Sequence, residues 1–137
     1  MPALARLKPT TVLEDATVPR SRIPDMVKRI NEIGRIYNLD IGTFGHAGDG
    51  NLHPTILTDR RDQKEFARVE KAIDDIFEAA LALGGTLSGE HGIGLAKRPF
   101  LSIALDEATI AFEKSIKRAF DPVNVLNPGK IFPGETV

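Results

Sequence analysis

An α+β fold, in which helices pack on one face of a small and mainly antiparallel sheet, is predicted for this 137-residue sequence. Two observations lead to that class. Segments rich in β-forming residues and longer segments with helical periodicity follow one another in the order β-α-β-β-α-(β)-α. The two central strands are separated by the turn dipeptide Asp49-Gly50, which is typical of a β-hairpin and therefore of antiparallel pairing.

The composition is that of an ordinary soluble globular protein, with 42% hydrophobic and 27% charged residues. The 18 basic and 19 acidic residues nearly cancel, so the sequence lacks the excess of positive charge that is typical of proteins binding nucleic acid or anionic membranes. No apolar run approaches the roughly 18 residues that can span a bilayer. The absence of cysteine excludes disulfides, cysteine-ligated zinc and thiol nucleophiles. We expect a cytoplasmic protein without a transmembrane segment.

The N-terminal part is predicted to hold a tail, a strand and a helix. Residues 1–10 form the tail, and β-rich residues over 10–18 predict a strand. Ser21 is a good helix N-cap, and Pro24 suits a first helical turn. Apolar residues then recur at helical spacing, which predicts a helix over 22–38.

Residues 40–46 and 51–58 are predicted to be the strands of the hairpin. If Asp49 and Gly50 form a two-residue type I′ loop, His46 lies directly opposite His53. In this register Pro54 falls in a pair without hydrogen bonds, and its bare nitrogen faces outward.

The C-terminal half is predicted to be mainly helical. Residues 62–83 carry an apolar stripe opposite charged residues, and two glycines end this helix. Residues 86–88 suit a short strand, and residues 89–94 form a glycine-spaced loop. A further helix is predicted over 106–120, and the tail from 121 to 130 is extended. The apolar part of that helix consists of Ile110, Phe112, Ile116 and Phe120.

Two of the three histidines flank one turn, which suggests a metal site. Directly opposed Cβ atoms lie about 4.5–5.5 Å apart, and two nitrogens on one tetrahedral zinc lie roughly 3.3 Å apart, so side-chain rotation brings His46 and His53 to one ion. Glu90, in the glycine-spaced loop, is the natural third ligand. Two histidines and one carboxylate suit a catalytic site for zinc, ferrous iron or manganese.

His91 follows Glu90 directly, and neighbouring side chains on an extended segment diverge. We therefore expect His91 beside the metal, where a histidine can serve as a general base. Glycines around this loop would let its backbone approach a ligand closely. The sequence leaves a plain alternative open, because a histidine on a half-buried strand is usually only hydrogen-bonded. In that case the domain is purely structural.

Three blocks resemble the C-terminal part of FAD-linked oxidases, in the glycolate oxidase large-subunit and D-lactate dehydrogenase group of the vanillyl-alcohol-oxidase-type flavoproteins. The blocks are GHAGDGNLH over 45–53, SGEHGIG over 88–94 and LNPGKIF over 126–132. The resemblance implies that residues 11–137 are part of a substrate- and metal-binding cap domain of ferredoxin-like type.

The same resemblance implies oxidation of a 2-hydroxy acid to a 2-oxo acid, with hydride transfer to FAD. It implies that His46, His53 and Glu90 bind a divalent metal ion and that His91 takes the hydroxyl proton. The resemblance also implies that Asn127 and Lys130 approach the flavin.

The family's N-terminal FAD-binding domain has no counterpart in this sequence, so we expect a fragment that is inactive alone. Thr55 also stands where relatives often carry a polar amide. The resemblance implies a flavin-binding domain or subunit as partner and an iron–sulfur subunit that carries electrons away. Partner subunits would also account for a location at the membrane periphery. A homodimer through an exposed apolar surface is a further expectation. The alternative is a non-catalytic metal-binding or subunit-interaction module.

Overall fold

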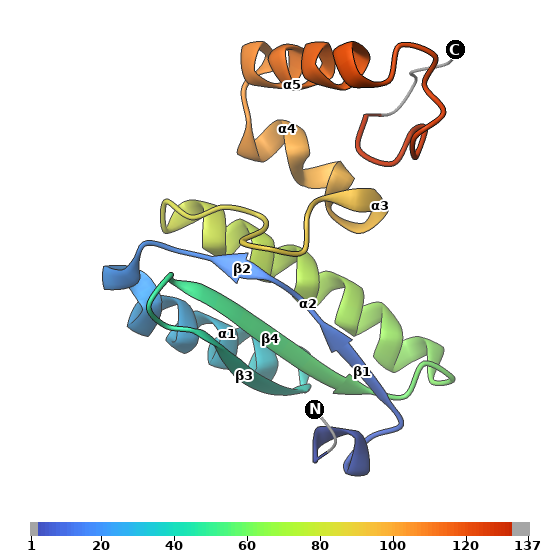
Figure 1. Ribbon diagram of the computed structural model, residues 1–137. Coiled ribbons are helices and arrows are strands. Elements are labelled where there is room, and N and C mark those ends of the chain that lie inside the picture. Colours follow the sequence, from blue (N-terminus) through green and yellow to red (C-terminus); the bar gives the residue numbers. More distant parts are fainter. Residues whose placement is uncertain (1–2, 133–137) are drawn as a thin grey trace. The chain divides into compact units, whose positions relative to one another are not determined.

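The computed structural model describes residues 3–132. The chain divides into two compact units, Met1–His91 and Gly92–Val137, which we call the sheet unit and the helical unit. The elements of the sheet unit (Figure 1) are η1 (Leu4–Arg6), β1 (Thr10–Leu13), β2 (Ala16–Thr17), η2 (Arg20–Arg22), α1 (Ile23–Tyr37), β3 (Asp40–His46), β4 (Asn51–Thr58) and α2 (Gln63–Ala82). The helical unit holds α3 (Gly94–Lys97), η3 (Arg98–Phe100), α4 (Leu101–Ala104) and α5 (Glu107–Phe120).

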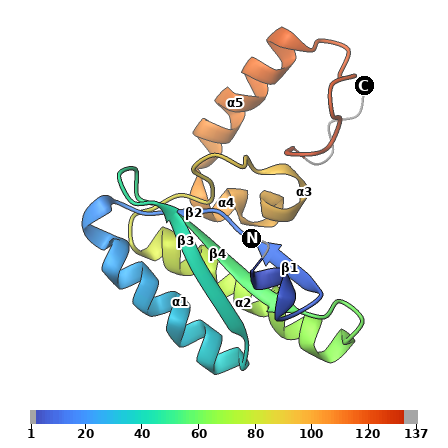
Figure 2. The same cartoon turned by 60° about the horizontal axis from the view of Figure 1, so that its bottom comes forward.

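Strand β4 is the centre of an antiparallel sheet, which confirms the predicted α+β class (Figure 2). It pairs with β3 along one edge and with both β1 and β2 along the other. The pairs Leu13–Thr55 and Ala16–Leu52 belong to one continuous register, so β1 and β2 are two parts of a single interrupted strand.

Helices α1 and α2 cover one face of this sheet and pack against each other. Leu52 and Ile56 of β4 are buried in the core together with Ile30 of α1 and Ile76 of α2. Because side chains alternate along a strand, His53 points to the opposite face of the sheet. We call that surface the site face.

The interruption between β1 and β2 has a chemical cause in Pro54. The Pro54 carbonyl accepts a hydrogen bond from Glu14 N at 2.9 Å, but its nitrogen carries no hydrogen to donate in return. The nitrogen faces away from β3, as the sequence predicts, so Pro54 loses no hydrogen bond to its hairpin partner. The prediction was wrong only in leaving that side open, because the interrupted strand lies there. The predicted strand over 10–18 is correspondingly broken at residues 14–15.

The bounds of both hairpin strands are confirmed, but the predicted register was wrong. His46 pairs with Asn51, and Phe44 pairs with His53, so the loop has four residues, 47–50. A contact with residue Val18, outside the hairpin, fixes the conformation of this loop. Val18 N donates to Gly50 O at 3.0 Å, and Gly50 has φ +78° where a Cβ would lie 2.0 Å from Val18 O.

The predicted helices over 22–38, 62–83 and 106–120 are confirmed as α1, α2 and α5, with small shifts at their ends. Ser21 is not the N-cap of α1, because it lies in η2 and Arg22 precedes the helix without a side-chain cap. The short strand at 86–88 reduces to one bridge between Thr17 and Thr86. Within residues 3–132, no helix meets the length and apolarity that crossing a membrane requires.

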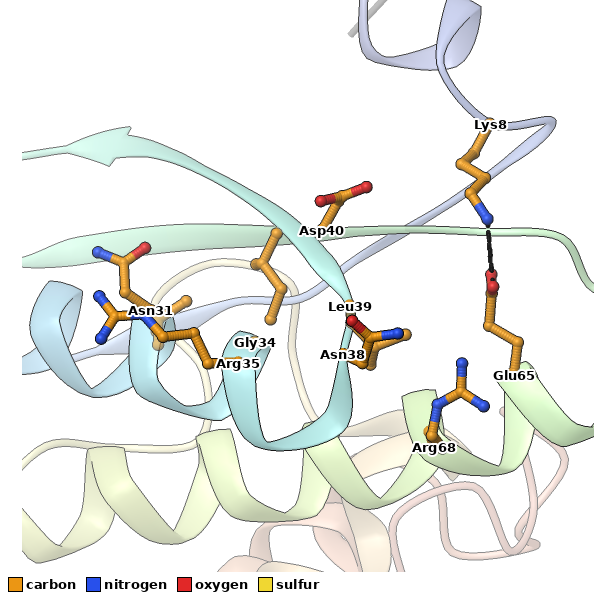
Figure 3. A pocket seen from close by; sticks show the side chains of 11 residues that line it. Lys8, Asn31, Gly34, Arg35, Asn38, Leu39, Asp40, Glu65 and Arg68 are labelled. Carbon is orange, nitrogen blue, oxygen red and sulfur yellow. Dashed lines mark hydrogen bonds and ion pairs between the residues drawn. The ribbon is translucent and has the colours of Figure 1, made fainter.

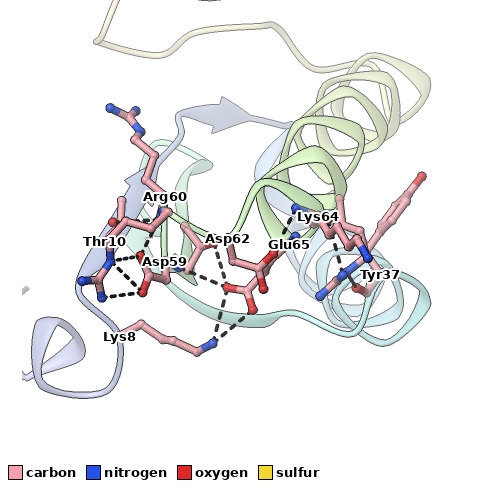
Figure 4. A network of polar contacts seen from close by, with 11 residues as sticks. Lys8, Thr10, Tyr37, Asp59, Arg60, Asp62, Lys64 and Glu65 are labelled. Carbon is pink, nitrogen blue, oxygen red and sulfur yellow. Dashed lines mark hydrogen bonds and ion pairs between the residues drawn. The ribbon is translucent and has the colours of Figure 1, made fainter.

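Glu65 joins the N-terminal segment, the end of β4 and the start of α2 (Figure 4). Its carboxylate accepts hydrogen bonds from the Thr58 hydroxyl at 2.8 Å, Lys8 Nζ at 3.1 Å and Asp59 N at 3.1 Å. Figure 3 shows the same Lys8–Glu65 pair beside a cavity of about 510 Å³. None of the candidate metal ligands lines that cavity, so this network stabilises the fold away from the site.

Replacing Glu65 by glutamine should lower the free energy of unfolding and make that free energy less dependent on pH. The hydrogen bonds from Thr58 and Lys8 lower the pKa of Glu65 from its ordinary 4.5. Its stabilising effect is therefore present above that value and is lost as the pH falls through the lower folded pKa. We expect E65Q to reduce the free energy of unfolding at neutral pH by roughly 1–3 kcal/mol, with a shallower decline below about pH 5.

Urea unfolding followed by circular dichroism measures both effects. Glu70→Gln, an exposed change in the same helix, is the matched control and should behave like the parent chain. An unchanged pH slope in E65Q would contradict the assignment.

Candidate metal centre

Two histidines of the hairpin and a glutamate from the loop beyond α2 meet on the site face of the sheet unit. Glu90 Oε1 lies 2.9 Å from His53 Nε2 and 3.4 Å from His46 Nε2. One ligand atom from each of the three residues lies within 4.8 Å of the others. These separations suit ligands of one ion, since two ligand atoms on a tetrahedral zinc lie roughly 3.3 Å apart.

His46 and His53 meet although the predicted register was wrong. The observed register differs from the predicted one by two residues, and an even shift keeps every side chain on its face. His46 is therefore diagonal to His53, with ring centroids 5.3 Å apart and planes at 88°. Phe44 takes the directly opposed position, with its ring 5.5 Å from that of His53.

The cluster is buried on one side and open on the other. The His53 side chain is only 5% exposed, whereas those of His46 and Glu90 are 57% and 49% exposed. His53 Nδ1 is buried without a hydrogen-bond partner among residues 3–132. A buried imidazole whose Nε2 points at a carboxylate, beside a second imidazole and open space, has the chemistry of a metal site with free coordination positions.

His91 lies beside this group rather than in it. Its ring stacks on that of His53, with centroids 5.2 Å apart and planes at 13°, and it is exposed. Within the part of the chain that the structure describes, the potential metal-binding group contains His46, His53 and Glu90 only. The placement is the one expected of a nearby base, and the role itself stays a prediction.

Sequence reasoning missed the residue that holds the loop of Glu90 and His91. The Asp15 side chain is buried, and its Oδ2 accepts hydrogen bonds from the backbone N–H groups of Gly89, Glu90 and His91. A signal was available, because an acidic residue inside a half-buried β-rich run requires hydrogen-bond partners.

Gly89 serves the packing of this loop. A Cβ at Gly89 would lie 2.3 Å from Thr17 Oγ1 and 2.7 Å from Asn51 Nδ2. The glycine thus lets the loop backbone approach β2 and β4 closely. The sequence predicts that the glycines of this loop let it approach a ligand, but the close neighbours of Gly89 belong to the protein itself.

Thr55 follows His53 on the same face and is fully buried. Its hydroxyl donates to the carbonyl of His53 at 3.4 Å. Thr55 is therefore a buried polar residue on the same face of β4 as His53.

Asn127 and Lys130 lie in the helical unit, in a turn near the end of the described chain. Asn127 has a left-handed φ of 51°, and its carbonyl accepts a hydrogen bond from Lys130 N at 3.3 Å. Both residues line a cavity of about 220 Å³, together with apolar side chains of the same unit. Their predicted approach to a flavin stays a prediction.

Comparisons with known proteins agree on one family. A model of FAD linked oxidases, C-terminal domain, matches residues 1–131. The chain is 61% identical over 130 residues to the glycolate oxidase subunit GlcD of Bacillus subtilis and 39% identical over 132 residues to GlcD of Escherichia coli. It is 40% identical over 130 residues to D-2-hydroxyglutarate dehydrogenase of Stutzerimonas stutzeri. These matches cover 95%, 96% and 90% of this chain but only 28%, 26% and 27% of the relatives.

Replacing Gly89 by alanine should destabilise the sheet unit. The added methyl group collides with Thr17 and Asn51, and overpacking of this kind costs about 1–3 kcal/mol. The matched control is Gly48→Ala, because a Cβ at Gly48 has no neighbour within 4 Å. Thermal unfolding should show a lower midpoint for G89A and little change for G48A. Equal midpoints would contradict the close packing of the loop.

Proposed function

The chain belongs to the FAD-linked oxidases, and we propose that it is the substrate- and metal-binding part of an FAD-dependent dehydrogenase of 2-hydroxy acids such as glycolate or D-lactate. The observation that carries the proposal is the convergence of His46, His53 and Glu90 with His91 beside them. The names of the relatives support the substrate class, because glycolate and D-2-hydroxyglutarate are both 2-hydroxy acids.

His46, His53 and Glu90 would hold a divalent ion: zinc, ferrous iron or manganese. Two imidazole nitrogens and a carboxylate oxygen suit these ions, and the exposed side of the cluster leaves room for substrate oxygens. When bound, the ion would act as a Lewis acid toward the substrate's hydroxyl and carboxylate groups and lower the pKa of that hydroxyl. His53, being buried, would fix the position of the ion against the sheet.

His91 would accept the hydroxyl proton of the substrate. Its ring is exposed, so a substrate can reach it, and its stacking on His53 keeps it next to the cluster. Its backbone N–H is held by Asp15 at 2.9 Å, which restrains the residue further. These contacts support the proposal, because they hold His91 next to the cluster, where it would act as the proton acceptor that general base catalysis requires.

FAD would accept the hydride from the α-carbon of the substrate, and a flavin-binding domain or subunit would supply it. Asn127 and Lys130 are our proposed contacts to that flavin from this chain. We propose that the chain alone is inactive, that an iron–sulfur subunit takes the electrons onward, and that the assembly is cytoplasmic and meets the membrane only through its partner subunits.

The helical unit offers an apolar surface for such a partner. Helix α5 has no buried residue, although it is clearly amphipathic. Phe112 is 65% exposed and Phe120 is 82% exposed, and with Ile116 they recur every four residues on one side of the helix. Apolar surfaces of this kind mark interaction sites. The same observation favours the second candidate function, a non-catalytic metal-binding or subunit-interaction module.

The metal assignment predicts one equivalent of a divalent ion per chain. Purified protein, incubated with zinc and then desalted, should retain it by elemental analysis, while His53→Ala and Glu90→Gln should not. Zinc should also raise the melting temperature, since a ligand at 100 times its Kd stabilises the folded state by about 2.7 kcal/mol. His91→Asn is the control and should keep the ion, because His91 is proposed as a base. A parent chain without bound metal would contradict the proposal.

The exposed face of α5 predicts self-association when no flavin-binding partner is present. Light scattering should show a concentration-dependent homodimer for the parent chain and a monomer for the double variant Phe112→Ser, Phe120→Ser. Ile103→Ser removes an equally exposed apolar side chain from α4 and should leave the dimer intact. A parent chain that stays monomeric at high concentration argues against this surface.

A further inference from the structure

We propose that Asp15 is a positioning residue of the metal centre. Its carboxylate holds the Ser88 hydroxyl and the backbone N–H groups of residues 89–91 so that Glu90 and His91 face His53. The expected effect of Asp15 on metal binding rests on the proposed metal-binding function. The positioning of the loop rests only on the contacts of Asp15.

The contacts converge on one oxygen atom. Asp15 Oδ2 accepts from Ser88 Oγ at 2.6 Å, Gly89 N at 2.9 Å, Glu90 N at 3.0 Å and His91 N at 2.9 Å. Successive backbone N–H groups that point into one concavity form an anion-binding nest. Here the anion is a side chain of the protein, and its burial strengthens each charge-assisted hydrogen bond.

The position of Asp15 in the sheet decides where the loop lies. The register of β1 and β2 against β4, continued through the interruption, sets Asp15 opposite His53. The carboxylate therefore anchors the loop next to the buried histidine. Glu90 Oε1 then reaches His53 Nε2 at 2.9 Å, and the His91 ring stacks on the His53 ring.

The negative charge is the property that this role requires. Asparagine has nearly the same shape, but its amide oxygen is a weaker acceptor and its NH2 group would compete as a donor. The three N–H groups are also already engaged by Asp15, so a substrate carboxylate has to be bound by other groups of the site. Asp15 thus arranges the ligands without contacting the substrate.

Amide hydrogen exchange of the metal-free parent chain tests the geometry directly. Gly89, Glu90 and His91 lie in an exposed loop, yet their amides should exchange at least tenfold more slowly than that of Gly48 in the hairpin loop. Exchange at the rate of Gly48 would overturn the proposal. This measurement needs neither a variant nor a metal ion.

Asp15→Asn tests the role of the charge. At a temperature where circular dichroism shows both chains folded, the amides of residues 89–91 should lose their protection in D15N, while those of α2 keep theirs. The zinc Kd, measured by calorimetry with zinc alone, should rise by roughly tenfold or more, as for other residues that orient metal ligands. Asp49→Asn is the control, because it removes the same charge from the exposed loop next to His46 and should leave both readouts unchanged.

The outcomes separate the two proposals. If the parent chain binds no zinc but its loop amides are protected and D15N releases them, the metal function fails and the positioning of the loop holds. If D15N keeps both the protection and the zinc affinity, or if D49N has the same effect as D15N, the role of Asp15 is refuted. Should D15N not fold, Ser88→Ala removes one of the four hydrogen bonds and should speed exchange at 89–91 severalfold; no change would refute the role.

Discussion

The hydrogen bonds that end on Asp15 Oδ2 join two parts of the sheet unit that the chain order keeps apart. His46 and His53 belong to a hairpin, whereas Glu90 and His91 belong to a loop beyond α2. Packing of α2 against the sheet brings the loop near the site face, but a glycine-rich loop alone has many conformations. The carboxylate selects the one in which Glu90 meets both histidines. The hairpin alone holds His46 next to His53, and the link through Asp15 adds Glu90 to them.

The break in the edge strand provides the place for this link. Pro54 cannot donate to the strand beside it, so the ladder is interrupted at Glu14 and Asp15. The interruption leaves a buried acidic residue beside β4 whose side chain can bind the loop. The interruption of the edge strand therefore also provides Asp15, the residue that holds the loop of the site. The core on the opposite face, where Leu52 and Ile56 pack against the helices, tolerates it because its side-chain alternation is unbroken.

Much of the fold could be predicted from sequence because the signals are local. The helical periodicity of α1 and α2 and the β-rich residues of the hairpin gave bounds close to those observed. The register could not be predicted, because the contact between Val18 and Gly50 selects a four-residue loop over the preferred two-residue turn. The prediction that His46 and His53 lie close together on one face survived only because the register error was an even number of residues. Asp15 could not be placed, since its partners lie more than 70 residues away in sequence. The short helices over 94–104 have too few residues to show a period.

X-ray absorption at the zinc edge tests the central claim, that the cluster on the site face is a metal centre, most directly. The zinc-loaded chain should show two imidazole nitrogens at about 2.0–2.1 Å and a carboxylate oxygen at about 2.0–2.2 Å, with the outer scattering of two histidine rings. A spectrum of oxygen ligands alone, or one with the scattering of a single ring, would contradict the account.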